Sequence, residues 1–159
     1  MKTLTLFRHA EAAYALPNGI DKNRTLTQNA ANKSKSHYQR LINNGIDIDL
    51  VLCSTATRCV QTVASFETKA KVVYIDSLYE SAVINIFEVI KQNSTSAHHV
   101  LVCAHNPALA QFIYTLSNTF YHIEPADFVT FGYDKMPFDL EKLNSIMPAV
   151  LLTSTTFMS

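Results

Sequence analysis

Short apolar runs recur along this chain and predict the strands of a β-sheet. The runs are rich in Val, Ile, Leu and Thr, and turn-forming residues separate them. Six segments have this pattern: residues 3–7, 50–53, 71–75, 100–104, 127–133 and 149–153. A turn-prone segment, residues 134–148, joins the last two. We therefore expect six strands.

Helical patterns fill most of the intervals between these strands. The four expected helices span about 27–42, 54–66, 83–92 and 105–116. Thr27 and Ser54 are the expected N-cap residues of the first two helices, because a hydroxyl group there can accept a backbone N–H. Pro17 and Gly19 mark residues 11–24 as a loop.

Strands that alternate with helices indicate βαβ units and a parallel sheet. Because crossover helices cover both faces of such a sheet, the expected fold is α/β, a three-layer sandwich with a mostly parallel central sheet. No linker, repeat or low-complexity segment divides the sequence, so residues 1–159 are expected to form one domain. In open sheets of this kind, ligands bind beyond the carboxyl ends of the strands.

The charge balance argues against two classes of partner. With 13 basic and 13 acidic side chains the formal net charge is zero, so no basic field attracts nucleic acid or an anionic membrane. No apolar run approaches the length of a membrane span, and Arg8 interrupts the N-terminal run too early for a signal peptide. We expect a cytoplasmic protein in which any anion site is local.

The cysteine and histidine spacings do not indicate a metal site, and we expect no cofactor. Three cysteines without Cys-x-x-Cys spacing are expected to be buried thiols: Cys53, Cys59 and Cys103. A cysteine-dependent phosphatase needs five residues between its thiol and its arginine, whereas four separate Cys53 from Arg58. Four other histidines are expected on the surface or in loops: His37, His98, His99 and His122.

Side chains suited to binding and attacking an anion follow the first four strands. Arg8 and His9 follow the first strand, and Arg58 lies one helical turn after the second. Glu80 follows the third strand and His105 the fourth. Because the carboxyl ends of parallel strands meet at one edge of a sheet, we expect these side chains to lie close together.

An ordered set of motifs resembles the histidine phosphatase superfamily, whose signature is Arg-His-Gly at the end of the first strand. The chain is most similar to the short phosphohistidine phosphatase group typified by SixA. The resemblance implies a phosphoglycerate mutase-like fold and a hydrolase that needs no metal. The matching segments are LFRHAEA at 6–12, DKNRTLT at 21–27, CSTATRCVQT at 53–62, LYE at 78–80 and VCAHNPAL at 102–109.

The resemblance also implies roles for individual residues. His9 would be the nucleophile that takes the phosphoryl group, and His105 would be the second histidine of the phosphate pocket. Arg8 and Arg58 would bind the phosphate oxygens, and Arg24 would lie near the mouth of the pocket. Arginine suits this task because one guanidinium can hold two oxygens at once.

Two features of the family pattern are open in this sequence. Ala10 stands where the signature has glycine, which restricts the backbone there and disfavours a positive φ. Glu80 is the first candidate for the general acid that protonates the leaving group, and Asp21 and Glu11 are weaker ones. The short phosphohistidine group often lacks a clear acid, since a phosphorylated imidazole is already a good leaving group. Glu80 could equally be a helix-start residue whose charge suits the helix dipole.

The expected activity is removal of phosphate from phosphohistidine on a protein, and a phosphorelay domain is one such substrate. Between Glu80 and His105 the sequence has room for only one helix and one strand, so we expect an open, shallow pocket. Two alternatives stay open. The protein could act on a small phosphoester, as a phosphomonoesterase or mutase does, or it could be a catalytically weak phosphate-binding module.

Overall fold

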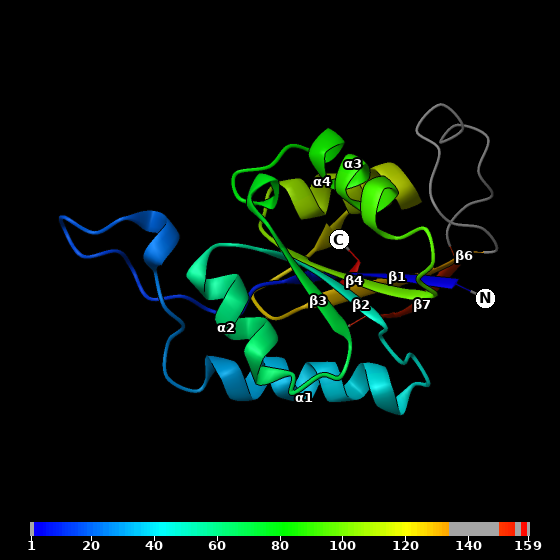
Figure 1. The fold of residues 1–159 in the computed structure, drawn as a ribbon, viewed down its shortest axis with the longest axis horizontal. Helices are drawn as coiled ribbons and strands as arrows, with labels where there is room; N and C mark the ends of the chain where they lie inside the picture. The colour runs from blue at the N-terminus through cyan, green and yellow to red at the C-terminus, as the bar shows by residue number, and fades with distance from the viewer. Residues whose placement is uncertain (1, 134–149, 155–156, 159) are drawn as a thin grey trace.

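A six-stranded sheet lies in the middle of the molecule (Figure 1). In the computed structural model, which describes residues 2–133, 150–154 and 157–158, the strand order is β3-β2-β4-β1-β6-β7. These strands are β1 (Lys2–Arg8), β2 (Leu50–Ser54), β3 (Lys71–Ile75), β4 (His99–Ala104), β6 (Phe128–Tyr133) and β7 (Val150–Ser154). The first four run parallel to one another, whereas β6 is antiparallel to β1 and to β7. The mostly parallel sheet is thereby confirmed.

Helices cover both faces of this sheet (Figure 1). They are α1 (Ala30–Asn43), α2 (Thr57–Ser65), α3 (Val83–Asn93) and α4 (Ala108–Ser117). α1 packs beside α2 on one face, and α3 packs beside α4 on the other. The side chains of β1 alternate accordingly: Leu4 and Leu6 join the core under α3 and α4, while Phe7 joins the core under α1 and α2. This confirms the expected three-layer α/β sandwich.

Both expected N-caps are wrong, because each hydroxyl lies too early in the chain. The backbone carbonyl of Thr27, and not its hydroxyl, accepts the N–H of Ala30 at the start of α1. Ser54 is still the last residue of β2, and its hydroxyl accepts the N–H of Ala56 before α2 begins. The later start of α2 places Arg58 in its first turn.

The structure adds short elements that sequence periodicity did not predict. β5 (Tyr121–His122) and β8 (Phe157–Met158) form a separate two-stranded sheet, and two residues are too few to show an alternating pattern. Two 3-10 turns, η1 (Asp21–Asn23) and η2 (Asp76–Leu78), also precede longer elements. The predicted turn segment at 134–148 lies outside the described residues.

The prediction that four histidines lie on the surface or in loops is right for two of them. His98 and His122 are exposed. His37 is half-buried on α1, and its Nδ1 lies 2.7 Å from the carbonyl oxygen of Ala126. His99 is half-buried at the start of β4, where its Nδ1 lies 2.9 Å from a threonine hydroxyl of β1. These two rings help to tie the elements together.

The carboxyl ends of the parallel strands place several polar residues at one edge of the sheet. β1 ends at Arg8, β2 ends at Ser54, and His105 directly follows β4. β3 leads through η2 toward Glu80. Among the described helices, none is both long and apolar enough to cross a membrane.

Candidate active site

The imidazole of His9 is held in one orientation directly after β1. Its ring is almost fully buried, and its Nδ1 lies 2.7 Å from the backbone carbonyl oxygen of Ala10. Because a carbonyl oxygen can only accept a hydrogen bond, Nδ1 carries the proton and donates it. The lone pair of the imidazole is therefore on Nε2, which is free to act as a nucleophile.

Burial keeps this imidazole uncharged. Burial lowers the pKa of His9 from 6.5 to about 3, although the hydrogen bond to Ala10 opposes the change. Electrostatic interactions with His105, Arg58 and Arg8 lower the pKa of His9 further. At neutral pH the ring is consequently in the state that can attack an electrophile.

Two arginines from different elements lie close to this ring. Arg58, on the first turn of α2, is buried, and its Nη1 donates to the backbone carbonyl of Asp21 at 3.0 Å. Its Nη2 lies 3.3 Å from a carboxylate oxygen of the same aspartate. Arg8 donates from Nη1 to the carbonyl oxygen of Ile123 at 2.9 Å. Each guanidinium is thus anchored by its Nη atoms.

The ring of His105 stands beside that of His9, with 5.2 Å between the ring centroids. Its Nε2 lies 2.9 Å from the hydroxyl of Ser54 and 3.5 Å from the thiol of Cys59. If the serine hydroxyl donates to Nε2, the ring proton is on Nδ1. That nitrogen has no hydrogen-bond partner among the described residues.

The buried polar atoms that lack a partner gather at this edge of the sheet. Native proteins leave few buried polar groups unpaired, so such a cluster needs an explanation. Among the described residues, the side-chain atoms of this kind are Arg8 Nε, Arg58 Nε, Ser81 Oγ, His105 Nδ1 and Asn106 Oδ1. Three of them are nitrogens from the arginines and the second histidine. They are the donor set that a phosphate-like oxyanion requires.

A cavity of about 310 Å³ adjoins these groups. Arg58 and His105 line it, whereas Arg8 and His9 do not; the ring of His9 lies beside that of His105. Its lining residues come from η1, α2, the segment after η2 and the start of α4: Asp21, Arg58, Tyr79, Glu80, Ser81, His105, Asn106, Pro107 and Ala108. The predicted residues that follow β2, β3 and β4 therefore share this cavity, and His9, which follows β1, adjoins it beside His105.

Tyr79 and Asp21 form a contact that the sequence did not predict. The hydroxyl of Tyr79 donates to a carboxylate oxygen of Asp21 at 2.7 Å, which raises the pKa of Tyr79 to about 12. The same bond, followed by the contacts from Arg24 and Arg58, lowers the pKa of Asp21. An ionised Asp21 has no proton to give, so the structure makes it a positioning residue for Arg58 and not the general acid.

Arg24 is engaged by the loop in which it lies. Its Nε donates to the carbonyl of Ala13 at 2.7 Å, and its Nη2 lies 3.4 Å from the carbonyl of Ala12. Its Nη1 lies 3.2 Å from a carboxylate oxygen of Asp21. Arg24 does not line the cavity, so contact between Arg24 and phosphate stays a prediction.

Glu80 lies at the rim of the cavity and is exposed. It precedes Ala82, the N-cap of α3, so it is not a residue of the first helical turn. Its φ of 51° places it in the left-handed region, which is strained for a side chain other than glycine and is often found at functional sites. The carboxylate remains the candidate acid from this edge of the sheet.

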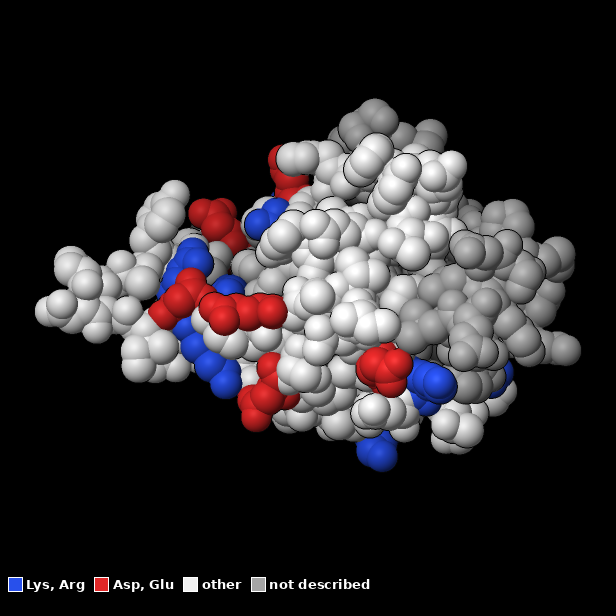
Figure 2. All heavy atoms as spheres, turned by 90° about the horizontal axis from the view of Figure 1, so that it is seen from above, with Lys and Arg blue, Asp and Glu red and all other residues white. Residues whose placement is uncertain are grey.

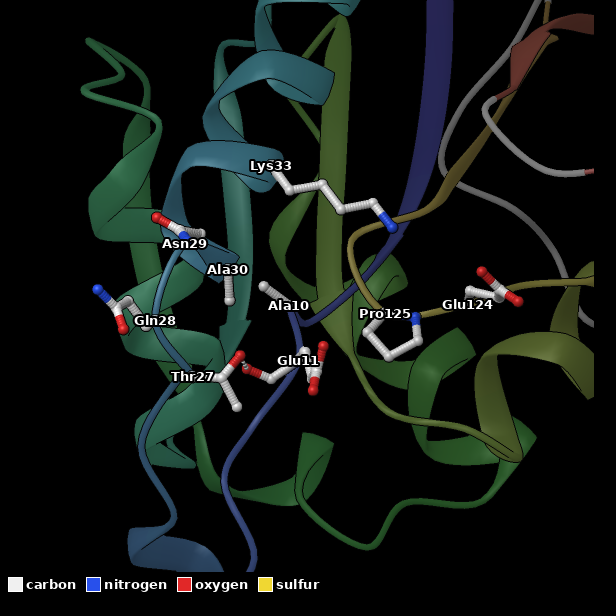
Figure 3. Close-up of a pocket in the computed structure, with 9 residues that line it drawn as sticks. All are labelled: Ala10, Glu11, Thr27, Gln28, Asn29, Ala30, Lys33, Glu124 and Pro125. Carbon is white, nitrogen blue, oxygen red and sulfur yellow. Dashed lines mark hydrogen bonds between the residues drawn. The ribbon is translucent and has the colours of Figure 1, made fainter.

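Ala10 fits its position without the freedom of glycine. Its φ is not positive, its side chain is fully buried, and its methyl group lies beside that of Ala30 at the edge of a second cavity (Figure 3). Its N–H donates to the hydroxyl of Thr62 at 2.9 Å, and that hydroxyl donates to the carbonyl of Arg58 at 2.6 Å. The alanine thus joins the end of β1 to α2.

The second cavity, of about 380 Å³, lies on the other side of Ala10 and carries charges of both signs. Figure 3 shows Lys33 and Glu124 at its border, with Glu11 below them. Glu11 lines this cavity and not the one that Arg58 and His105 line. This placement does not favour Glu11 as the general acid.

Comparisons with known proteins bear on the family and on the fold. No family model matches the chain. It is 35% identical over 116 residues to the uncharacterized protein MT1313 of Mycobacterium tuberculosis, which covers 70% of this chain and 72% of the relative. It also superposes on the structure of a candidate phosphohistidine phosphatase SixA from Nakamurella multipartitia with a TM-score of 0.84 and 26% identity, over 97% of this chain and 95% of that one.

The chain belongs to the histidine phosphatase superfamily and to its SixA-like group. A structure of the protein histidine phosphatase SixA complexed with tungstate matches with a TM-score of 0.78 and 18% identity, over 97% and 96% of the two chains. The phosphoglycerate mutase-like fold implied by the motifs is therefore confirmed for this histidine phosphatase.

Several residues of the site carried no signal in the sequence. Tyr79 is next to Glu80 in the Leu-Tyr-Glu segment, but nothing there indicates that its hydroxyl reaches η1. Thr62 and Cys59 lie on α2 at positions that apolar periodicity describes only as buried. Their contacts depend on how α2 packs against β1 and β4, which one-dimensional patterns do not specify.

We expect His9 to stay neutral in the folded protein well below the usual pKa of histidine. Long-range ¹H–¹⁵N spectra should show an Nδ1-protonated ring from pH 8 down to about pH 4.5, whereas histidine in an unfolded peptide titrates near pH 6.5. Since the unfolded chain takes up this proton and the folded chain does not, His9 also makes the fold less stable as pH falls from 6.5 toward 3. A titration of the folded ring near pH 6.5 would contradict the structure.

The substitution Ala10→Gly should weaken the fold without improving the site. Loss of a buried methyl group and the added freedom of glycine lower the free energy of unfolding by about 1 to 2 kcal/mol. Urea denaturation measures this change, and titration with tungstate should give a Kd within about twofold of that of the unchanged protein. A gain in stability would show that the backbone at Ala10 is strained.

Proposed function

We propose that this protein is a phosphatase that works through a phosphohistidine intermediate on His9. The observation that carries the proposal is a neutral imidazole with a free Nε2, which lies among the unpaired nitrogens of Arg8, Arg58 and His105. A nucleophile without charge and an array of positive donors are what transfer of a phosphoryl dianion requires.

In the first step, the Nε2 lone pair forms a bond to phosphorus while the bond to the leaving group breaks. The leaving group takes the electron pair of that bond and acquires a proton, from the carboxyl group of Glu80 when an alcohol leaves and from solvent when imidazole leaves. Negative charge spreads over the three equatorial oxygens, and the guanidinium groups of Arg8 and Arg58 stabilise it. Because their Nη atoms are anchored, these groups need little rearrangement when the charge develops.

In the second step, water attacks phosphorus and the N–P bond breaks. The electron pair returns to Nε2, the water gives its proton to solvent or to the Glu80 carboxylate, and inorganic phosphate leaves. The hydrogen bond from Nδ1 to Ala10 persists through both steps and keeps the ring in place. His105 and the start of α4 stabilise the phosphate through an N–H donor and the positive end of the helix dipole.

We infer that the substrate is a protein that carries phosphohistidine, with a phosphorelay domain as one example. Two observations support this substrate class. The likeness to proteins described as phosphohistidine phosphatases extends over nearly the whole chain. In addition, the candidate acid Glu80 is exposed at the rim, an arrangement that a good leaving group such as imidazole tolerates.

A small phosphoester is the second candidate substrate, and the presence of a carboxylic acid residue in the cavity lining supports it. Glu80 lines the same cavity as Arg58 and His105, which supports it as a proton donor for a leaving oxygen. An alcohol is a poor leaving group, and its departure depends strongly on a proton donor. The two substrate classes therefore differ in how much they need this residue.

A trapping experiment tests the intermediate. After rapid mixing with a protein labelled at phosphohistidine and an alkaline quench, we expect a labelled enzyme whose label is stable to base and lost in acid. His9→Ala should abolish the label, and the exposed-residue variant His98→Ala should retain it. Phosphate release by His9→Ala at the normal rate would rule out His9 as the nucleophile.

Replacement of Glu80 by glutamine should separate the substrate classes. For an alkyl phosphate such as glycerol phosphate, whose alcohol is a poor leaving group, loss of a general acid lowers kcat/KM by roughly 10² to 10⁴. Toward a phosphohistidine protein the loss should be much smaller, because imidazole leaves easily. Glu11→Gln, which changes a carboxylate of the other cavity, is the matched control. Equal losses on both substrates would remove Glu80 as an acid.

A further inference from the structure

A hairpin-like arm, residues 12–26, projects from the end of β1 and is seen in dark blue in Figure 1. Its two legs are tied together by an antiparallel bridge between Ala12 and Leu26 and by the bond from the Ala13 N–H to the Thr25 carbonyl at 2.8 Å. The guanidinium of Arg24 fastens the legs again through the carbonyls of Ala12 and Ala13. These hydrogen bonds fix the two legs of the arm relative to each other.

The tip of the arm, residues 14–20, is apolar and exposed. Tyr14 is 94% exposed, Leu16 79% and Ile20 67%. The tip contains no charged residue, and Figure 2 shows it as an uncharged lobe that extends beyond the charged side chains near its base. A single exposed apolar residue is ordinary, but three within seven residues of one projecting loop indicate a surface that another molecule covers.

Local bonds hold these side chains away from the core. The N–H of Gly19 donates to the carbonyl of Leu16 at 2.7 Å and closes a turn, in which Pro17 fixes one backbone angle. A side chain at Gly19 would meet the backbone of Leu16 at 3.1 Å, so glycine allows this close approach. The apolar residues are consequently presented to solvent by the turn and do not fold back onto the body.

The tip is joined directly to the phosphate site. Ile20 is followed by Asp21, whose carboxylate accepts hydrogen bonds from Arg58 and Tyr79. Seven residues that go out and return can extend by at most about 12 Å. A small phosphoester in the cavity would not touch the whole tip, whereas a folded domain about 30 Å across would lie against it.

We propose that the tip of the arm is a docking surface for the phosphorylated protein substrate, which presents an apolar patch beside its phosphohistidine. This inference rests on the proposed function. The link through Asp21 favours the substrate over a second copy of this chain, because Asp21 lines the cavity and a protein whose phosphohistidine enters the cavity also lies beside the tip. The tip gives contact area to a protein and none to a free phosphorylated amino acid.

The test compares two substrates with one set of variants. The probes are free phosphohistidine and a phosphorelay domain phosphorylated on histidine with phosphoramidate. We expect the triple variant Tyr14→Ser, Leu16→Ser and Ile20→Ser to lower kcat/KM toward the domain by at least tenfold, through KM. Its kcat/KM toward free phosphohistidine should change less than twofold. Since the contact is apolar, the loss should persist in 0.5 M salt.

Matched controls and contrary outcomes keep the proposal separate from the function on which it rests. Tyr74→Ser combined with Phe120→Ser removes exposed apolar residues elsewhere and should leave both activities unchanged. Equal losses on both substrates, or no loss on the domain, would overturn the docking role. A wild-type dimer that becomes monomeric in the triple variant by light scattering, with domain activity retained, would assign the tip to self-association. If the wild type hydrolyses neither probe, the proposed function itself fails.

Discussion

The site depends on keeping one imidazole uncharged beside two guanidinium groups. Burial supplies most of this effect, and the bond from the Nδ1–H of His9 to the Ala10 carbonyl decides which nitrogen keeps its lone pair. Ala10 also donates its own N–H to the hydroxyl of Thr62, which donates in turn to the carbonyl of Arg58. The nucleophile and one of its cationic partners are therefore positioned by a single short chain of buried hydrogen bonds.

Asp21 has a comparable role on the opposite side of the cavity. Its carboxylate and carbonyl hold Arg58, its carboxylate accepts from Tyr79, and Arg24 connects it to the legs of the arm. Positioning of the arginine and presentation of the apolar tip thus share one residue. Replacement of Asp21 would disturb both, which is why the arm is better probed at its tip.

The sequence could predict which residues meet at the strand ends, because the carboxyl ends of parallel strands always lie at the same edge of a sheet. Once the strands are known to be parallel, Arg8, His9, Arg58 and His105 must lie at one edge. The contact of Tyr79 could not be predicted, because it depends on how a loop folds against η1. The prediction that Ser54 caps α2 was wrong because β2 extends to Ser54. At the end of the strand the hydroxyl of Ser54 lies beside Nε2 of His105.

The unpaired nitrogens at the site also have a thermodynamic meaning. Each buried donor without a partner lowers the stability of the folded chain by about 1 to 3 kcal/mol. An oxyanion that pairs with Arg8 Nε, Arg58 Nε and His105 Nδ1 binds only the folded form, since these residues come from three distant parts of the sequence. At a concentration one hundred times its Kd, such a ligand adds about 2.7 kcal/mol to the free energy of unfolding. The donors that bind phosphate therefore lower the stability of the free protein, and bound phosphate restores that stability.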